Sequence, residues 1–180
     1  VKSMTLHGLE GFIVDVQVDV AGGLPCWEIV GLPDVSIREA KERVRTAIKN
    51  SGYEFPSRRI VINLAPATIK KVGSAFDLPI AIAILLATEN INEFDFENVA
   101  FVGELSLDGN VHSINGILPM CIEAKKLGIK EIIVPKENAK EASIVDGIGV
   151  IPVSSLNQVV AYLNKSIKIN PEKFNSNELI

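Results

Sequence analysis

Residues 70–87 read KKVGSAFDLPIAIAILLA, and the second half of this stretch decides the fold. From Leu78 to Ala87 every side chain is apolar, so the segment has no polar face. A helix that is apolar all round lies inside a protein core, and this one falls short of the roughly 20 residues of a membrane span. Asp77 stands where an N-cap is expected, which predicts a buried helix over 77–87. We interpret Asp77 first as that cap and second as a functional acid.

Strands and helices are predicted on both sides of this buried helix. Residues 11–20 alternate like a half-buried strand, residues 26–32 are expected to be its hairpin partner, and residues 58–66 form a further strand. Residues 35–51 are expected to form a helix whose apolar stripe includes Val35, Ile37, Ala40, Val44, Ala47 and Ile48. Downstream, the pattern predicts a hairpin over 98–114, helices over 115–128, 137–143 and 155–164, and strands over 130–135 and 149–155.

This order of elements is typical of an α/β (α+β) sandwich with a mixed sheet. One domain is expected over residues 1–165, and residues 166–180 lose periodicity like a linker. The start of the chain lacks the pattern of a signal peptide. Cys26 and Cys121 lie in apolar segments and are expected to be buried, reduced thiols.

Several kinds of catalytic and cofactor site find no support in the sequence. The patterns GxxxxGK[ST], GxGxxG, HExxH, CxxC and GxSxG do not occur. His7 and His112 are the two histidines, and neither lies in an obvious catalytic loop. We therefore expect no metal site and no cofactor in this stretch of chain.

Nine cations gather within about 34 residues of a chain whose net charge is −4. Lysine and arginine neutralise the phosphates of nucleic acids without reading sequence, which makes the cluster a candidate nucleic-acid-binding surface. Two other interpretations remain open, namely a solvated helix face balanced by Glu39 and Glu42, and a contact surface for another domain or subunit. The candidate residues are Arg38, Lys41, Arg43, Arg45, Lys49, Arg58, Arg59, Lys70 and Lys71.

Two long segments resemble a known family. They are GLPDVSIREAKERVRTAIKNSGYEFPSRRIVINLAPA, followed by FDLPIAIAIL, and VGELSLDGNVHSINGILPMCIEAKKLGIKEIIVPKEN. Over about residues 2–165 the chain is similar to the N-terminal domain of the Mg-chelatase-like AAA+ ATPase family that includes ComM and YifB. It also resembles the proteolytic domain of Lon proteases and the matching domain of RadA. The resemblance implies a two-layer sandwich of the Lon type, which is also the type of ribosomal-protein domain 2.

The resemblance further implies the setting in which such a domain works. An AAA+ module that binds ATP and Mg²⁺ would follow, in a cytoplasmic bacterial protein that forms a hexameric ring. Its partners would be that module, neighbouring subunits and DNA, and it would not bind a membrane. Its role would lie in recombination and natural transformation (competence).

Lon proteases use a serine in the loop before the buried helix and a lysine on a later helix. Alignment by this resemblance puts Ser74 or Ala75 at the serine position and Leu118 at the lysine position. Leucine cannot accept a proton, so the resemblance implies a domain without catalytic residues. The alternatives are a stand-alone serine hydrolase with a degenerate dyad, which rests on Ser74, and a purely structural oligomerisation module.

Overall fold

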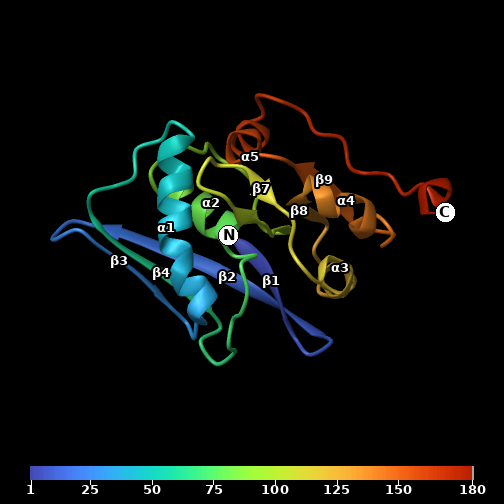
Figure 1. The fold of residues 1–180 in the computed structure, drawn as a ribbon, viewed down its shortest axis with the longest axis horizontal. Coiled ribbons are helices and arrows are strands. Elements are labelled where there is room, and N and C mark those ends of the chain that lie inside the picture. The colour runs from blue at the N-terminus through green and yellow to red at the C-terminus, as the bar shows by residue number, and fades with distance from the viewer. Residues whose placement is uncertain (180) are drawn as a thin grey trace.

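A computed structural model describes residues 1–179 and confirms a mixed α/β sandwich. Seven strands form one sheet (Figure 1), in the spatial order β3 (Cys26–Val30), β4 (Arg59–Ala65), β2 (Glu10–Ala21), β1 (Lys2–His7), β5 (Val99–Phe101), β8 (Glu131–Pro135) and β9 (Gly149–Val153). A separate hairpin is made by β6 (Glu104–Leu105) and β7 (Val111–His112). The helices are α1 (Val35–Asn50), α2 (Asp77–Ala87), α3 (Ile117–Lys126), α4 (Lys136–Ala142) and α5 (Leu156–Leu163), with a 3-10 turn at Ser176–Leu179.

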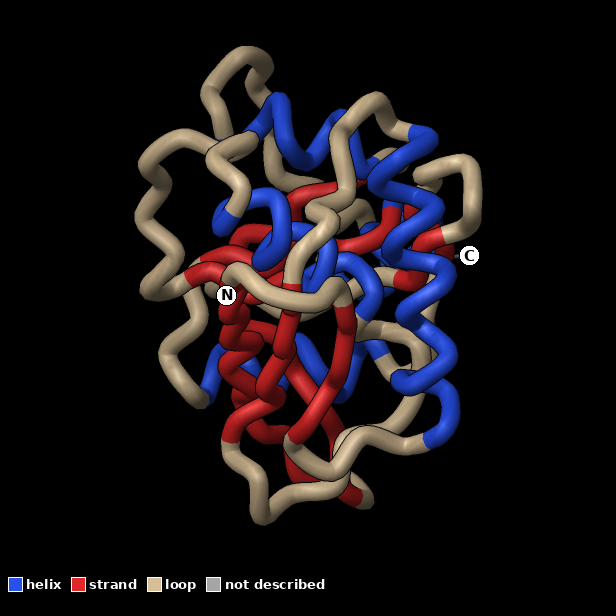
Figure 2. Tube along the Cα trace, turned by 90° about the vertical axis from the view of Figure 1, so that its left-hand side faces the viewer, coloured by secondary structure: helices blue, strands red, loops and turns tan. Residues whose placement is uncertain are grey.

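The helices cover the two faces of the sheet unequally. On one face α1, α2 and α5 share a core with β2, β4 and the inner side of β8 and β9. On the other face α3 and α4 pack over β1, β5, β8 and β9. Figure 2 shows the long helix α1 along one side of the strands. Helix α2 is buried from Asp77 to Leu85, as its apolar sequence predicts.

The N-terminal strands pair differently from the prediction. Residues 26–30 are not the hairpin partner of β2, because β3 pairs in parallel with β4. Strand β4 in turn pairs antiparallel with β2 along Asp15–Ala21 and occupies the edge that β3 would have needed. The hairpin partner of β2 is β1, a strand that the sequence patterns did not indicate. Strand β5 likewise joins the main sheet, and β6 and β7 alone form the predicted DG hairpin.

Helix α1 matches its predicted range and is capped by Asp34, whose Oδ1 accepts a hydrogen bond from the Ile37 N–H at 2.9 Å. Its core residues are Ile37, Ala40, Val44, Ala47 and Ile48. Val35 was wrongly placed in this stripe, since it is 69% exposed. At 3.6 residues per turn, Val35 lies on the side of the helix opposite to Val44.

The two cysteines lie in different environments. Cys121 is buried as expected, and burial raises the pKa of its thiol to about 12. Cys26 is exposed, contrary to the prediction, because β3 is the edge strand and Cys26 starts it. Between α5 and the 3-10 turn, residues 165–175 contain no helix or strand. Their interpretation as a linker stays a prediction.

Candidate nucleic-acid interface

The loop before α2 carries both residues expected near the Lon serine position. Ser74 is half-buried and Ala75 is buried, one residue before the N-cap Phe76. Leu118 is the second residue of α3, whose lysines come only at Lys125 and Lys126 in its last turn. Among residues 1–179, no lysine or histidine is hydrogen-bonded to the Ser74 hydroxyl. In the described part of the chain, Ser74 therefore has no positioned general base.

Asp77 forms a buried ion pair with Arg43 at the start of α2. Its side chain is 1% exposed and accepts hydrogen bonds from Arg43 Nε at 2.8 Å and Arg43 Nη2 at 3.0 Å. The backbone N–H of Leu105 donates to the same carboxylate at 3.0 Å. The N-cap interpretation of Asp77 is wrong, because Phe76 is the N-cap and Asp77 is the first helical residue. The carboxylate instead joins α1 and α2 to the β6–β7 hairpin.

The electrostatics of this pair follow from burial. Burial raises the pKa of Asp77, and the hydrogen bond from Arg43 opposes that rise. The hydrogen bond with Asp77 raises the pKa of Arg43, which also donates to the Ser36 carbonyl at 3.1 Å. The Arg43 guanidinium is thus hydrogen-bonded within the protein and is not available to bind a ligand.

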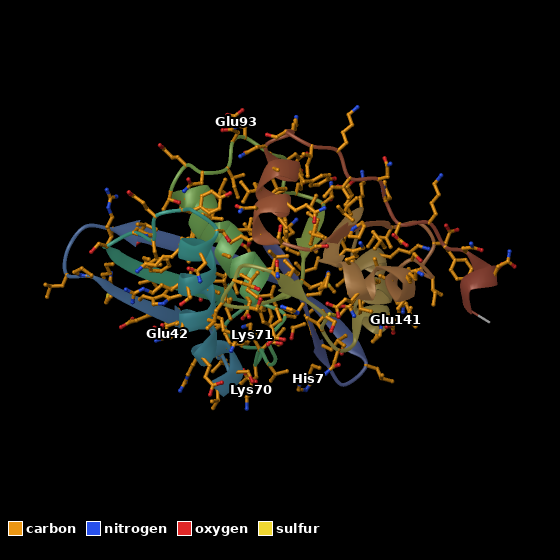
Figure 3. The ribbon with its side chains drawn as sticks, turned by 45° about the horizontal axis from the view of Figure 1, so that its top comes forward. His7, Glu42, Lys70, Lys71, Glu93 and Glu141 are labelled. Atoms are coloured by element: carbon orange, nitrogen blue, oxygen red, sulfur yellow. The ribbon has the colours of Figure 1, made fainter. Side chains whose placement is uncertain are left out.

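Lys71 is also buried inside the protein, with an exposed fraction of 0%. Its amine donates to the carbonyls of Gly31, at 2.9 Å, and of Pro66. Its backbone pairs with the same region, because Lys71 N–H donates to Leu32 O at 3.0 Å and Asp34 N–H donates to Lys71 O at 3.0 Å. Lys71 therefore ties the loop before α2 to the entry of α1, out of reach of a phosphate. Figure 3 shows it inward of its exposed neighbour Lys70.

The burial of Lys71 can be tested by comparing the pH dependence of stability in the wild type and in the variant Lys71→Met. Burial lowers the pKa of Lys71 below its ordinary value of 10.5, so the charged amine is less favourable in the folded chain than in the unfolded chain. The resulting penalty is present below the folded pKa and disappears as pH rises through it towards the unfolded value. From about pH 7 to about pH 10, the wild type should therefore gain stability relative to Lys71→Met, measured by urea unfolding.

The control for that measurement is Lys70→Met, which removes an exposed lysine one residue away. It separates the effect of burial from the effect of deleting a positive charge. If the stability of the wild type relative to Lys71→Met stayed constant or fell towards high pH, that result would contradict a buried amine that is charged at neutral pH.

Four other cations form one row on α1, here called the basic stripe. Arg38, Lys41, Arg45 and Lys49 follow one another at intervals of three, four and four residues, which puts them on one flank of the helix. This flank faces β3 and the segment before β4, because Lys41 Nζ lies 3.4 Å from Trp27 O and the Arg45 guanidinium lies 5.8 Å from the centre of the Phe55 ring. Among residues 1–177, no carboxylate lies within 4.0 Å of the charged groups of the stripe.

The remaining candidate cations fall into three separate positions. Arg58 is exposed and lines the same cleft as Lys49, so it continues the basic stripe. Arg59 begins β4 next to the buried Ile60, and the alternation of a strand turns it to the sheet face away from α1. Lys70 is exposed in the loop that pairs with the entry of α1, near the N-terminal end of the stripe.

The cleft at the C-terminal end of α1 has a volume of about 970 Å³. Aromatic and basic side chains from different segments meet in it, notably Tyr53 and Phe55 with Lys49 and Arg58. Neither aromatic residue is among the candidates predicted from the sequence. The signal for them was present in YEFPSRR (53–59), where aromatic residues are followed directly by arginines.

The β6–β7 turn brings a serine, a histidine and an aspartate together on the surface. His112 Nε2 lies 2.9 Å from Ser106 Oγ, and Ser106 Oγ also donates to Asp108. The serine therefore stands between the other two residues, whereas a catalytic triad needs the histidine in the middle. Hydrogen bonds from Ser106 and from the Asn110 N–H lower the pKa of Asp108, as expected of a carboxylate that holds a turn.

Among residues 1–179, no helix is long and apolar enough to cross a bilayer. Among the side chains that the structure describes, no group of three or more His, Cys, Asp or Glu residues could hold a metal ion.

Comparison with known proteins identifies the family. The family model for subunit ChlI of Mg-chelatase matches residues 16–138. The chain belongs to this Mg-chelatase-like family. Competence protein ComM of Haemophilus influenzae is 37% identical over 169 residues, which cover 94% of this chain and 33% of ComM. YifB of Escherichia coli is 43% identical over 150 residues, covering 83% of this chain and 29% of YifB.

Other relatives also match most of this chain. An uncharacterised protein of Mycobacterium tuberculosis, Rv2897c, is 42% identical over 164 residues, which cover 91% of this chain and 33% of that protein. Lon protease 2 of Bacillus subtilis is more distant, at 29% identity over 190 residues covering 95% of this chain and 33% of the protease. The resemblance to ComM, YifB and Lon is thereby confirmed. The chain spans about a third of the length of these curated relatives.

Proposed function

We propose that this chain is the non-catalytic N-terminal domain of a ComM/YifB-like ATPase and that it holds DNA by the phosphate backbone. The basic stripe on α1 is the contact surface, with Arg58 at one end and Lys70 near the other. The observation that carries the proposal is the placement of four cations on one helix flank with no carboxylate partner in the described residues.

The dimensions of the stripe suit a phosphate backbone. From Arg38 to Lys49 the helix advances about 16 Å at 1.5 Å per residue. Over that length, one strand of DNA carries about five phosphates. Glu39 and Glu42 project from the neighbouring, outward face of the helix, so they border the stripe without interrupting it. A contact of this kind gives affinity without sequence preference.

The rest of the protein is proposed from its relatives. ATP and Mg²⁺ would be held by an AAA+ module outside this chain, in a cytoplasmic ring, hexameric in the full protein, whose subunits this domain helps to assemble. Competence protein ComM is connected with competence by its name. We extend this role to handling of DNA in recombination and transformation. A serine hydrolase is not favoured, because Ser74 has no positioned base in the described residues.

The test is DNA affinity measured by fluorescence anisotropy with a labelled oligonucleotide. The variant Arg38→Gln/Arg45→Gln/Lys49→Gln removes three exposed charges of the stripe. Its affinity at moderate salt is expected to fall at least about tenfold, since each lost phosphate contact weakens binding. Unfolding by urea should show that the variant remains folded, because exposed helix positions tolerate glutamine well.

The matched control is Lys130→Gln/Lys136→Gln/Lys173→Gln, which removes three exposed lysines away from α1. It changes the net charge equally and is expected to bind DNA like the wild type. Equal losses in both triple variants would show a general charge effect, and unchanged affinity in the α1 variant would overturn the proposal.

A further inference from the structure

We infer that the cleft beside the basic stripe is a subsite for an unpaired base, so that the domain prefers single-stranded DNA over duplex. The inference rests on the proposed function and deepens it, since it names the form of DNA that the surface takes. Its starting point is the meeting of two aromatic rings, two cations and a cleft of about 970 Å³ at the end of α1.

The aromatic residues of the cleft are held in position by the fold. Tyr53 directly follows the turn that ends α1, and its backbone N–H donates to the Ile48 carbonyl at 3.2 Å. The Phe55 ring packs edge-on against Trp27, with ring centres 5.5 Å apart. Both Tyr53 and Phe55 are half-buried and line the cleft. The rings therefore form a wall of the cleft that is already held in place, so little side-chain entropy is lost when a ligand binds.

The cations stand where a phosphate chain would leave the cleft. Lys49 lines the cleft and is also the last residue of the basic stripe, so the two surfaces are continuous. Arg58 lines the cleft from the segment before β4. A strand that follows the stripe would reach the cleft with its backbone on Lys49 and Arg58. A neighbouring base could then stack on an aromatic ring.

The other polar groups of the cleft suit a base better than a phosphate. Glu54 and Glu89 line it, and so do Gly52, two residues after the end of α1, and Thr88, the C-cap of α2. Carboxylates and helix C-termini repel phosphates, whereas they accept hydrogen bonds from the N–H groups of a base. In duplex DNA the flat faces of the bases are covered by stacking, so a duplex cannot use the aromatic wall without unstacking.

Two labelled probes test the inference in anisotropy titrations, an oligothymidine of about 12 nucleotides and a duplex of the same length. The change Tyr53→Ala is expected to weaken oligothymidine binding about tenfold, because stacking contributes that much per base, and to leave duplex binding unchanged. Tyr53→Phe keeps the ring and should bind like the wild type. Tyr53→Leu keeps the apolar bulk without a ring and should show the loss again.

The chain offers a matched control and a second readout. Tyr162, the other tyrosine, lies on α5 outside the cleft, and Tyr162→Leu should leave both affinities unchanged. Trp27 is the single tryptophan, and its contact with Phe55 makes its fluorescence a reporter of the aromatic wall. Oligothymidine is expected to change this fluorescence, and the duplex is not.

The outcomes separate the inference from the proposed function. A selective loss of oligothymidine binding in Tyr53→Ala and Tyr53→Leu, with Tyr53→Phe intact, supports the subsite. Unchanged binding in every Tyr53 variant, or an equal loss for both probes, overturns the subsite while the stripe continues to account for DNA binding. Absence of any DNA binding by the wild type overturns both.

Discussion

Asp77→Ala is expected to lower the free energy of unfolding by about 3 kcal/mol, because it removes one partner of a buried ion pair. The loss leaves the Arg43 guanidinium and the Leu105 N–H without the carboxylate that both now contact. The figure lies at the lower end of the usual range because the Arg43 side chain is 23% exposed and water can reach part of it. Urea unfolding of both proteins measures the difference.

Two controls sharpen this prediction. Asp77→Asn keeps an oxygen acceptor in place and should cost less than Asp77→Ala, while Glu42→Ala removes an exposed carboxylate on α1 and should change stability by less than about 0.5 kcal/mol. A double-mutant cycle with Arg43→Met should show that the two sites are not additive. If Asp77→Ala proved as stable as Glu42→Ala, the ion pair would not be what joins α1, α2 and the hairpin.

Gly31→Ala is expected to destabilise the fold by about 3 kcal/mol or more, since strain and overlap act together. Gly31 has a φ of +102°, which L-residues with a side chain rarely adopt. A Cβ there would lie 2.3 Å from the Leu64 carbonyl oxygen and 2.9 Å from the Leu64 nitrogen, both in the backbone of β4. Relief would require β3 and β4 to separate or the Gly31 carbonyl to leave the Lys71 amine.

The control for Gly31→Ala is Gly22→Ala in the connection between β2 and β3. No atom lies within 4 Å of a Cβ at Gly22, so alanine should be tolerated there with little change in stability. Thermal unfolding compares the two variants, and equal melting temperatures would contradict the close approach of Gly31 to β4.

The sequence predicted those elements whose pattern is set locally. Helix α2 has no polar face between Leu78 and Ala87, and α1 carries its cap, Asp34, directly before its first turn. The pairing of β3 was mispredicted because neighbours in sequence were assumed to be neighbours in the sheet. Strand β4, which comes after α1, pairs with both β2 and β3. Such long-range competition leaves no local signal.

The residue types of the candidate interface could be predicted from the sequence, but not which of its cations point to the surface. The spacing of Arg38, Lys41, Arg45 and Lys49 is a helical pattern that the sequence contains. The inward turn of Arg43 depends on Asp77, which is 34 residues away. The burial of Lys71 depends on the carbonyl of Gly31, in the connection between β3 and α1, and on that of Pro66, in its own loop. Charge alone cannot distinguish a surface cation from one bound inside the fold.

The measurement that tests the central proposal most directly is the salt dependence of duplex DNA binding by the wild type and the Arg38→Gln/Arg45→Gln/Lys49→Gln variant. Each phosphate contact contributes about 0.9 to the slope of log K against log salt concentration. Loss of three contacts should make the slope shallower by about 2.7, while Lys130→Gln/Lys136→Gln/Lys173→Gln keeps the wild-type slope. Equal slopes in the wild type and the stripe variant would show that the basic stripe does not hold the DNA backbone.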